Sequence, residues 1–197
     1  MLVPSSPRRR SSRGRLFALA GLMLALTCPS VLDASIVIPA TLDELAGEAD
    51  LIVHARVARV DTRQAPGTLR VERVVALDVV RAWKGRPAGT VHVVLPGGTF
   101  GRYRTVVPGV PDVVEGEEAV LFLRASPAGV PQLVGLSQGL LRVRVDPATG
   151  ERRVAAPLAA DRDGPVVRGA TDRGPQPLAR IEARVAQVVL AELRGRR

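Results

Sequence analysis

This chain contains very little cysteine, lysine or aromatic side chain. Its 197 residues include one cysteine, one tyrosine, one tryptophan and three phenylalanines. The single cysteine, Cys28, has no second thiol to pair with, which excludes a fold stapled by disulfide bonds within the chain. Lys84 is the one lysine, and arginine supplies the other basic residues, which we interpret as compositional bias without mechanistic content. The fold must therefore be stabilised by a packed core.

The first 34 residues have the composition of a secretory signal peptide. Five arginines and no acidic residue lie in the first 15 positions, and the apolar run Leu16–Leu26 follows. Pro29 then ends any helix, and Ala34 is a small residue at a suitable cleavage point before Ser35. A spanning helix takes about 20 residues, so we expect cleavage, with an uncleaved anchor as the main alternative. The protein is then exported, periplasmic or extracellular, without a stable membrane span after cleavage.

Export changes the charge balance of the chain. The full sequence has 28 basic and 19 acidic residues, and removal of the leader takes away five arginines and Asp33, which leaves 23 and 18. A modest positive charge with interspersed acids is typical of a solvated surface rather than of a nucleic-acid-binding surface. The remaining 163 residues are enough for one domain with a core. We expect a monomer that binds no nucleic acid.

Residues 71–98 predict a long β-hairpin. Their apolar side chains recur at every second position, as expected for strands with one buried face: Val71, Val75, Leu77 and Val79, then Val91, Val93 and Leu95. The segment 84–89, which contains Gly and Pro, predicts the turn between the two strands. The first strand, 69–83, is long and must bend in a barrel, and the broken alternation at 73–76 predicts a bulge there.

The rest of the pattern predicts further strands and two helices. Thr41 and Glu44 form a capping box that begins a helix over 42–48, with Leu42 and Leu45 facing inward. Further strands are expected at 50–61, 90–95, 119–124, 132–136, 140–145 and, as the last, 152–155, with a candidate strand at 103–107. The run 119–124 is almost entirely apolar, which predicts burial on both faces. Near the end of the chain a helical stripe follows Pro177, and it comprises Leu178, Ile181, Val185, Val188 and Val189.

These elements predict a mainly β fold. We expect a small, closed or nearly closed antiparallel β-barrel of OB type, with a short N-terminal helix, an extra β-hairpin and a C-terminal α-helix packed on it. Residues 1–34 are assigned to the signal peptide, 35–157 to the OB-like barrel domain, 158–176 to a flexible linker and 177–197 to the amphipathic helix. OB barrels that bind oligonucleotides use aromatic stacking platforms, and the second and third strands offer only Trp83.

No set of residues for catalysis, metal binding or cofactor binding emerges from the sequence. Gly135–Gly139 matches the G-x-S-x-G nucleophile pattern, but no histidine follows Ser137 and the flanking segments resemble strands. Alternation places His54 and His92 opposite the apolar strand faces, so we expect both to face solvent, and two histidines alone do not make a zinc site. The acidic run Glu115–Glu118 is expected to be a solvated turn rather than a calcium site. We therefore expect a protein that is not an enzyme and uses no cofactor.

Function is best sought in the long connection 96–118, because long irregular connections are often functional. Phe100 and Tyr103 lie there beside Arg102 and Arg104, and aromatic and arginine side chains dominate binding hot spots. We hypothesise that these four residues contact a partner. The alternative is that the connection folds back and buries the two rings over the mouth of the barrel.

Three segments, taken in order, resemble a known group of exported proteins. They are Ala49–Val57, which begins ADLIV, Val79–Gly85, which ends AWKG, and Glu115–Leu123, which reads EGEEAVLFL. This layout resembles bacterial exported proteins with an OB-fold barrel like that of tissue inhibitors of metalloproteinases and netrin-type modules. It is also similar to uncharacterised bacterial exported proteins that open IPATLDELA, as Ile38–Ala46 does here. The resemblance covers residues 38–145 and implies the barrel fold.

The inhibitory mechanism of those inhibitors does not carry over. They chelate the zinc ion of a protease through an amino-terminal cysteine, and the exported chain has no cysteine after removal of Cys28. The sequence leaves three hypotheses. The first is a non-enzymatic binding module for a protein partner, with a protease as one candidate. The second is a structural or envelope-associated protein that docks by its C-terminal helix. The third is a hydrolase with an unrecognised site.

Overall fold

The computed structural model describes residues 40–155, except 88 and 127–128, together with residues 175–195. In chain order the elements are α2 (Leu42–Glu48), β1 (Leu51–Gln64), β2 (Val71–Lys84), β3 (Val91–Pro96), β4 (Gly98–Phe100), β5 (Tyr103–Thr105), β6 (Glu118–Arg124), β7 (Gln132–Leu133), the 3-10 turn η1 (Leu136–Gly139), β8 (Leu140–Val145), β9 (Arg152–Ala155), β10 (Gln176–Pro177) and α3 (Leu178–Gly195). The expected signal peptide, 1–34, and most of the expected linker, 158–176, lie outside the described residues. No helix in the described part is long and apolar enough to cross a membrane.

The strands form one antiparallel sheet and a separate two-stranded hairpin. The order across the sheet is β10-β9-β8-β6-β1-β2-β3, β7 pairs with the end of β6, and β4 pairs with β5. This confirms a mainly β antiparallel fold with a short N-terminal helix, a β-hairpin and a C-terminal helix. No closed ladder forms among the described residues, because β3 pairs with β2 alone and its other edge is not hydrogen-bonded to β7 or to β10.

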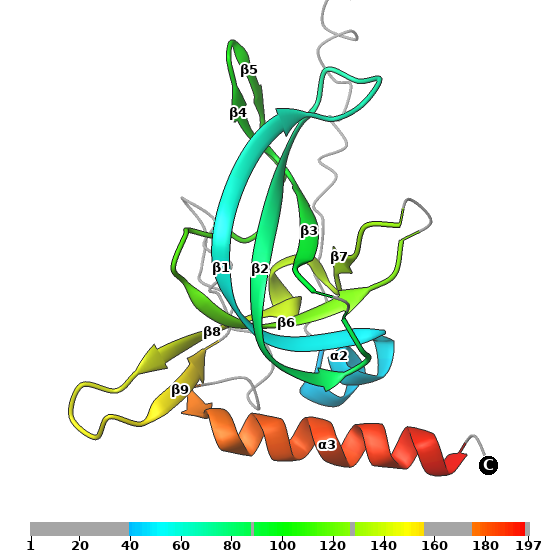
Figure 1. The fold of residues 1–197 in the computed structure, drawn as a ribbon, viewed down its shortest axis with the longest axis vertical. Coiled ribbons are helices and arrows are strands. Elements are labelled where there is room, and N and C mark those ends of the chain that lie inside the picture. The colour runs from blue at the N-terminus through cyan, green and yellow to red at the C-terminus, as the bar shows by residue number, and fades with distance from the viewer. Residues whose placement is uncertain (1–39, 88, 127–128, 156–174, 196–197) are drawn as a thin grey trace, which may run out of the picture. The chain divides into compact units, whose positions relative to one another are not determined.

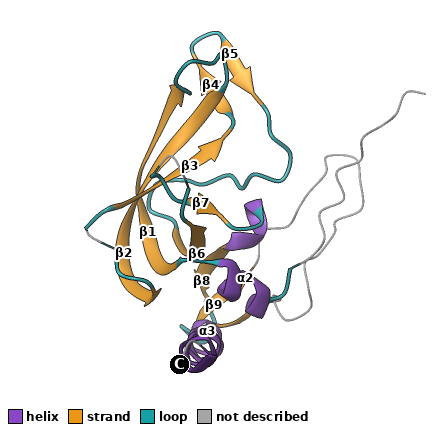
Figure 2. Ribbon diagram, turned by 90° about the vertical axis from the view of Figure 1, so that its right-hand side faces the viewer, coloured by secondary structure: helices purple, strands orange, loops and turns teal. Residues whose placement is uncertain are grey.

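The hairpin and the terminal helix lie at opposite ends of the sheet. Figure 1 shows β1 and β2 as long curved strands, with the β4–β5 hairpin at one end and α3 running across the other. In the view of Figure 2, turned by 90°, α2 lies beside α3 on the same side of the sheet. One end of the sheet is therefore covered by helices, and the other end carries the hairpin and the β1–β2 turn.

Hydrophobic side chains pack on both faces of the sheet. We call the first cluster the inner core; its buried members are Val53, Ala55, Val57, Val75, Leu77, Val91, Val93, Leu95, Val113, Ala119, Leu121, Leu123 and Leu140. We call the second the helix-side core; its buried members are Leu42, Leu45, Ala46, Ala49, Ile52, Val120, Phe122, Val134, Leu141, Val154, Ile181 and Val185. The predicted burial of β6 on both faces is confirmed, because its residues alternate between the two cores.

The expected bulge at 73–76 is wrong. Residues 72–76 of β2 pair regularly with both neighbours. The register shifts of the β1–β2 ladder leave Ala58 of β1 and Val80 and Trp83 of β2 without an opposite residue. The alternation breaks at Arg73 because this residue takes a position on the inner-core face. Its guanidinium donates there from Nη1 to Asp112 Oδ1 at 2.7 Å and from Nη2 to the carbonyl oxygen of Pro111 at 3.0 Å.

The helix α2 begins and ends with specific polar contacts. The predicted capping box is confirmed, since the Thr41 side chain accepts a bond from the Glu44 amide and the Glu44 carboxylate accepts one from the Thr41 amide. At the other end, Lys84 Nζ donates to the carbonyl oxygen of Ala46 at 2.8 Å and pairs with Glu192 of α3 at 2.9 Å. Lys84 thereby caps α2 and ties it to α3.

The C-terminal helix packs on the sheet as predicted. Ile181 and Val185 are buried in the helix-side core, and Leu178, Val188 and Val189 pack against it. The expectation that 152–155 is the last strand is wrong, because the short strand β10 pairs with β9 directly before α3 begins. Two ion pairs fix the helix further, from Arg184 to Asp43 of α2 and from Glu182 to Arg81 of β2.

Candidate functional site

The β4–β5 hairpin is fixed to the end of the main sheet by one backbone hydrogen bond and one bond to a side chain. Gly97 donates its N–H to the carbonyl oxygen of Val71 at 2.8 Å, and the Val71 N–H donates to Thr105 Oγ1 at 2.9 Å. Gly98 has φ of +136°, and a Cβ there would lie 3.2 Å from Thr62 and 3.4 Å from Val71. A glycine is therefore needed for β4 to approach the ends of β1 and β2 this closely.

The predicted partner-binding residues come together on this hairpin. Phe100 pairs with Tyr103 across the turn, and Gly101 at the first turn position has a φ of +57°, as type II′ hairpins require. The Arg102 guanidinium lies 5.1 Å from the centre of the Tyr103 ring and donates to the Tyr103 hydroxyl at 2.9 Å. Arg104 lies on the opposite hairpin face, across from Thr99, and is exposed.

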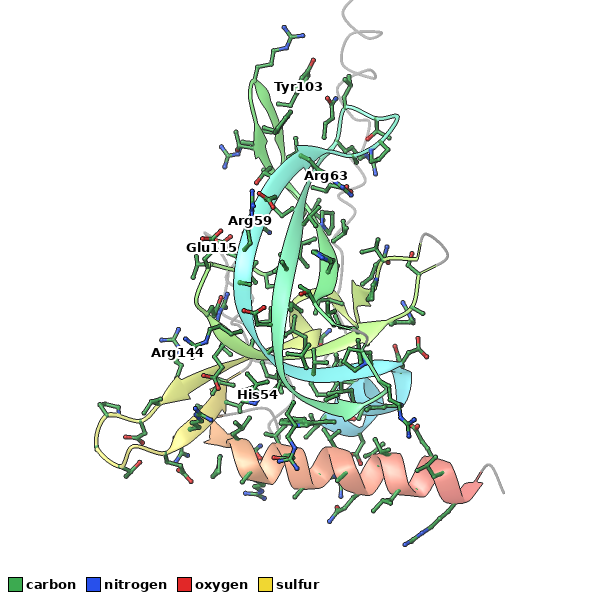
Figure 3. The ribbon with its side chains drawn as sticks, viewed as in Figure 1. His54, Arg59, Arg63, Tyr103, Glu115 and Arg144 are labelled. Atoms are coloured by element: carbon green, nitrogen blue, oxygen red, sulfur yellow. The ribbon has the colours of Figure 1, made fainter. Side chains whose placement is uncertain are left out.

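The Phe100 ring remains accessible. Its exposed fraction is 46%, while Tyr103 is half-buried under Arg102. The alternative, in which the connection folds back and buries both rings, therefore does not hold for Phe100. Figure 3 shows Tyr103 on the projecting hairpin, at the end of the sheet away from His54 and α3.

Sequence reasoning missed the residues that border the hairpin. Leu69 and Arg70 end the β1–β2 turn directly before Val71, which is bonded to the hairpin, and Val106 directly follows β5. Leu69 is 70% exposed and Val106 is 71% exposed. The only sequence signal is that Leu69 is a large apolar residue inside a turn. We define the hairpin-end surface as Leu69, Arg70, Phe100, Arg102, Tyr103, Arg104 and Val106.

The expectation that His54 faces solvent is wrong, whereas His92 is exposed as predicted. His54 is 4% exposed, because α2 and α3 cover the face of the sheet that alternation assigned to solvent. Its Nε2 lies 2.6 Å from Oε1 of Glu118 on the neighbouring strand β6, and its ring lies 6.2 Å from that of Trp83. Arg56 and Arg152 approach the same Glu118 carboxylate at 3.8 Å. We interpret this cluster as structural, since the Glu118 carboxylate is already paired with His54, Arg56 and Arg152.

The acidic run 115–118 is only partly the solvated turn that was expected. Glu115 is exposed, although its Oε1 accepts a bond from the Val60 amide at 3.1 Å. Glu117 is half-buried and bonded to Arg142, and Glu118 is held by His54. Within the described residues, no three His, Cys, Asp or Glu side chains converge in a way that could hold a metal ion.

Ser137 lies in the tight turn η1 rather than on a strand-to-helix elbow. Its N–H donates to the carbonyl oxygen of Gly109 at 2.9 Å. The nearby Gly139 is buried, and a Cβ at this position would lie 2.3 Å from the carbonyl oxygen of Val134. The two glycines around Ser137 are therefore explained by turn geometry and close packing, as the sequence indicated.

The inner core encloses no room for a ligand. The space among its side chains is about 10 Å³ and is lined mostly by apolar residues of β1, β2, β3, β6 and β8. Such a space is comparable to a single water molecule.

The chain matches no protein-family model, and it matches no curated protein either. A functional proposal has to rest on the geometry of the hairpin and its surroundings.

Proposed function

We propose that this chain is an exported, non-enzymatic binding module whose β4–β5 hairpin contacts a protein partner. The observation that carries the proposal is the combination of an accessible Phe100 ring with an Arg102–Tyr103 pair on a hairpin fixed by hydrogen bonds. Aromatic and arginine side chains held in one conformation lose little entropy when they bind. A protease is one class of partner within this proposal.

The scaffold is proposed to be a partly open barrel of OB type. In support, residues of β1, β2, β3, β6, β7 and β8 line one interior, although β3 and β7 are not hydrogen-bonded to each other. In such a barrel side chains fill the interior, and the loops and hairpins at the rim bind the ligand. The β4–β5 hairpin occupies such a rim position at the end of β1 and β2.

Site-specific photocrosslinking tests the proposal. A photoreactive phenylalanine analogue is placed at position 100 and, as the matched control, at Val145, which is 61% exposed on β8. In exporting cells we expect a discrete crosslinked protein from position 100 that is missing from position 145. The same products from both positions, or none from position 100, would contradict a partner site on the hairpin.

A second candidate is docking to the cell envelope through α3. Leu190 and Leu193 are exposed, and Leu190 lies on the opposite side of the helix from the buried Ile181. The variant Leu190→Gln, Leu193→Gln removes this exposed apolar surface and leaves the buried stripe intact. Loss of envelope association in cell fractionation would favour the second candidate, and unchanged fractionation would remove its support.

A further inference from the structure

The hairpin-end surface carries positive charge that no acidic residue balances. Segments 62–71 and 95–111, which build this end of the molecule, contain no Asp or Glu. Most arginines in the described part of the chain have a carboxylate within ion-pair distance, such as Arg63 with Glu72. Across those same described residues, no ion pair forms to Arg70, Arg102 or Arg104. This charge is complementary to a partner surface that carries negative charge.

Exposed apolar side chains are interspersed with these arginines. Leu69, Phe100 and Val106 are all large, apolar and exposed, on the hairpin or directly beside it. The Tyr103 hydroxyl and ring hold the Arg102 guanidinium in place, which presents a planar, pre-oriented fork of donors. Carboxylates match that fork with two parallel hydrogen bonds. The surface therefore suits a ligand that combines carboxylates with an apolar side chain.

Other polyanions fit the surface less well. Single-stranded nucleic acids need successive aromatic rings to stack bases, and Phe100 is the one ring on this surface that is not covered by an arginine. Anionic membranes are typically recognised by clusters of about 4–8 basic residues. The segments at this end contain four arginines, and one of them, Arg63, is neutralised by Glu72. Binding of an acidic protein segment requires neither a longer basic cluster nor further aromatic rings on this surface.

We infer that the partner presents an acidic segment, with Asp or Glu side chains around an apolar residue, to the hairpin-end surface. The inference rests on the proposed function, because it names the chemistry of the partner at the same site. The accessible Phe100 ring contacts the apolar residue. Arg70, Arg102 and Arg104 bind the flanking carboxylates.

Mass spectrometry of the product crosslinked at position 100 tests the inference. We expect the crosslinked segment of the partner to be rich in Asp and Glu around an apolar residue. A neutral or basic segment overturns the inference and leaves the proposed function standing, whereas the absence of a position-specific product overturns the proposed function itself. A synthetic peptide of that segment, and a copy with Asn and Gln in place of its acids, then serve as probes for the purified exported chain.

Charge variants give the second readout. Arg70→Gln with Arg102→Gln and Arg104→Gln removes the unpaired charges from the hairpin-end surface. Arg86→Gln with Arg144→Gln and Arg180→Gln removes the same charge from exposed arginines elsewhere. At low salt we expect the first variant to bind the acidic peptide about tenfold more weakly, since exposed charge pairs contribute about 0.5 kcal/mol each and 1.4 kcal/mol is a factor of ten. The second variant should bind like the parent chain.

Three results overturn the inference in these binding measurements. The first is equal binding of the acidic peptide and its amide copy. The second is equal weakening by both triple variants. The third is Phe100-dependent binding to phosphatidylcholine vesicles that contain phosphatidylglycerol, with no binding to the acidic peptide, which would identify a lipid surface as the ligand.

Discussion

At the scale of single residues, Gly85 is held in a conformation and a space that only glycine fits. Its φ is +76°, and a Cβ would lie 2.8 Å from the carbonyl oxygen of Asp50. Gly67 has a similar φ of +71° with nothing within 4 Å, so it shares the backbone requirement without the steric one. This pair of glycines separates the two effects.

We expect Gly85→Ala to lower the free energy of unfolding by about 3 kcal/mol, because backbone strain adds to a clash. Gly67→Ala should cost about 1 kcal/mol, from strain alone. Urea unfolding followed by circular dichroism measures both. Equal costs for the two variants would show that the contact with Asp50 is relieved by a small backbone shift.

His54 is a second residue whose surroundings set its role. Replacing His54 by Ala removes the bond to Glu118 and leaves a cavity beside Trp83. We expect a loss of about 2–3 kcal/mol in the free energy of unfolding. His92→Ala, on the exposed face of β3, should change stability by less than about 0.5 kcal/mol. Similar losses of unfolding free energy for the two variants in urea titrations would contradict the conclusion that His54 is buried and bonded to Glu118.

At the scale of elements, α3 is part of the fold. Val185 is buried in the helix-side core, whereas Leu190 is exposed on the same helix. Val185→Asn should lower the unfolding free energy by about 3 kcal/mol, since it buries an unpaired amide and loses apolar contact. Leu190→Asn should cost less than about 1 kcal/mol. Thermal unfolding of the two variants compares them directly, and equal losses would mean that α3 contributes no specific packing.

Elements with strong local signals could be predicted from the sequence, and elements defined by distant contacts could not. The capping box at Thr41, the alternation along β2 and the stripe of α3 each reflect a single periodicity or a local hydrogen bond. The short strand β10 depends on pairing with β9, and nothing in its two residues predicts a strand. The charged Arg73 on an apolar strand face led to the wrong prediction of a bulge. The residue that binds its guanidinium, Asp112, lies far along the chain and could not be recognised from the local sequence.

The candidate site could be predicted only in part, for the same reason. Phe100 and Tyr103 were identified as aromatic residues in a long connection, and their pairing across a hairpin agrees with that choice. Leu69 and Arg70 belong to a turn that meets the hairpin through the Val71 and Thr105 bond. His54 was assigned to the wrong environment because alternation distinguishes the two faces of a strand but does not reveal that helices cover the second face.

At the scale of the whole molecule, contacts within the sheet join three segments that are far apart in the sequence: 49–57, 79–85 and 115–123. Asp50 accepts a bond from the Ala125 amide at 2.8 Å, and Gly85 packs over the carbonyl oxygen of Asp50. The segments 49–57, 79–85 and 115–123 thus meet at one end of the sheet. Their residues have structural roles here, and the hairpin-end surface lies at the other end of β1 and β2.

The central claim is that the hairpin binds a protein partner, and the affinity of the crosslinked partner for hairpin variants tests it most directly. Calorimetric titration compares the parent chain with Phe100→Ala, Tyr103→Ala and with the control Val80→Ala, Val145→Ala, which removes exposed apolar residues from β2 and β8. We predict that the hairpin variant binds about tenfold or more weakly, as expected for a hot spot, while the control binds like the parent. Equal affinity of all three chains would contradict the claim.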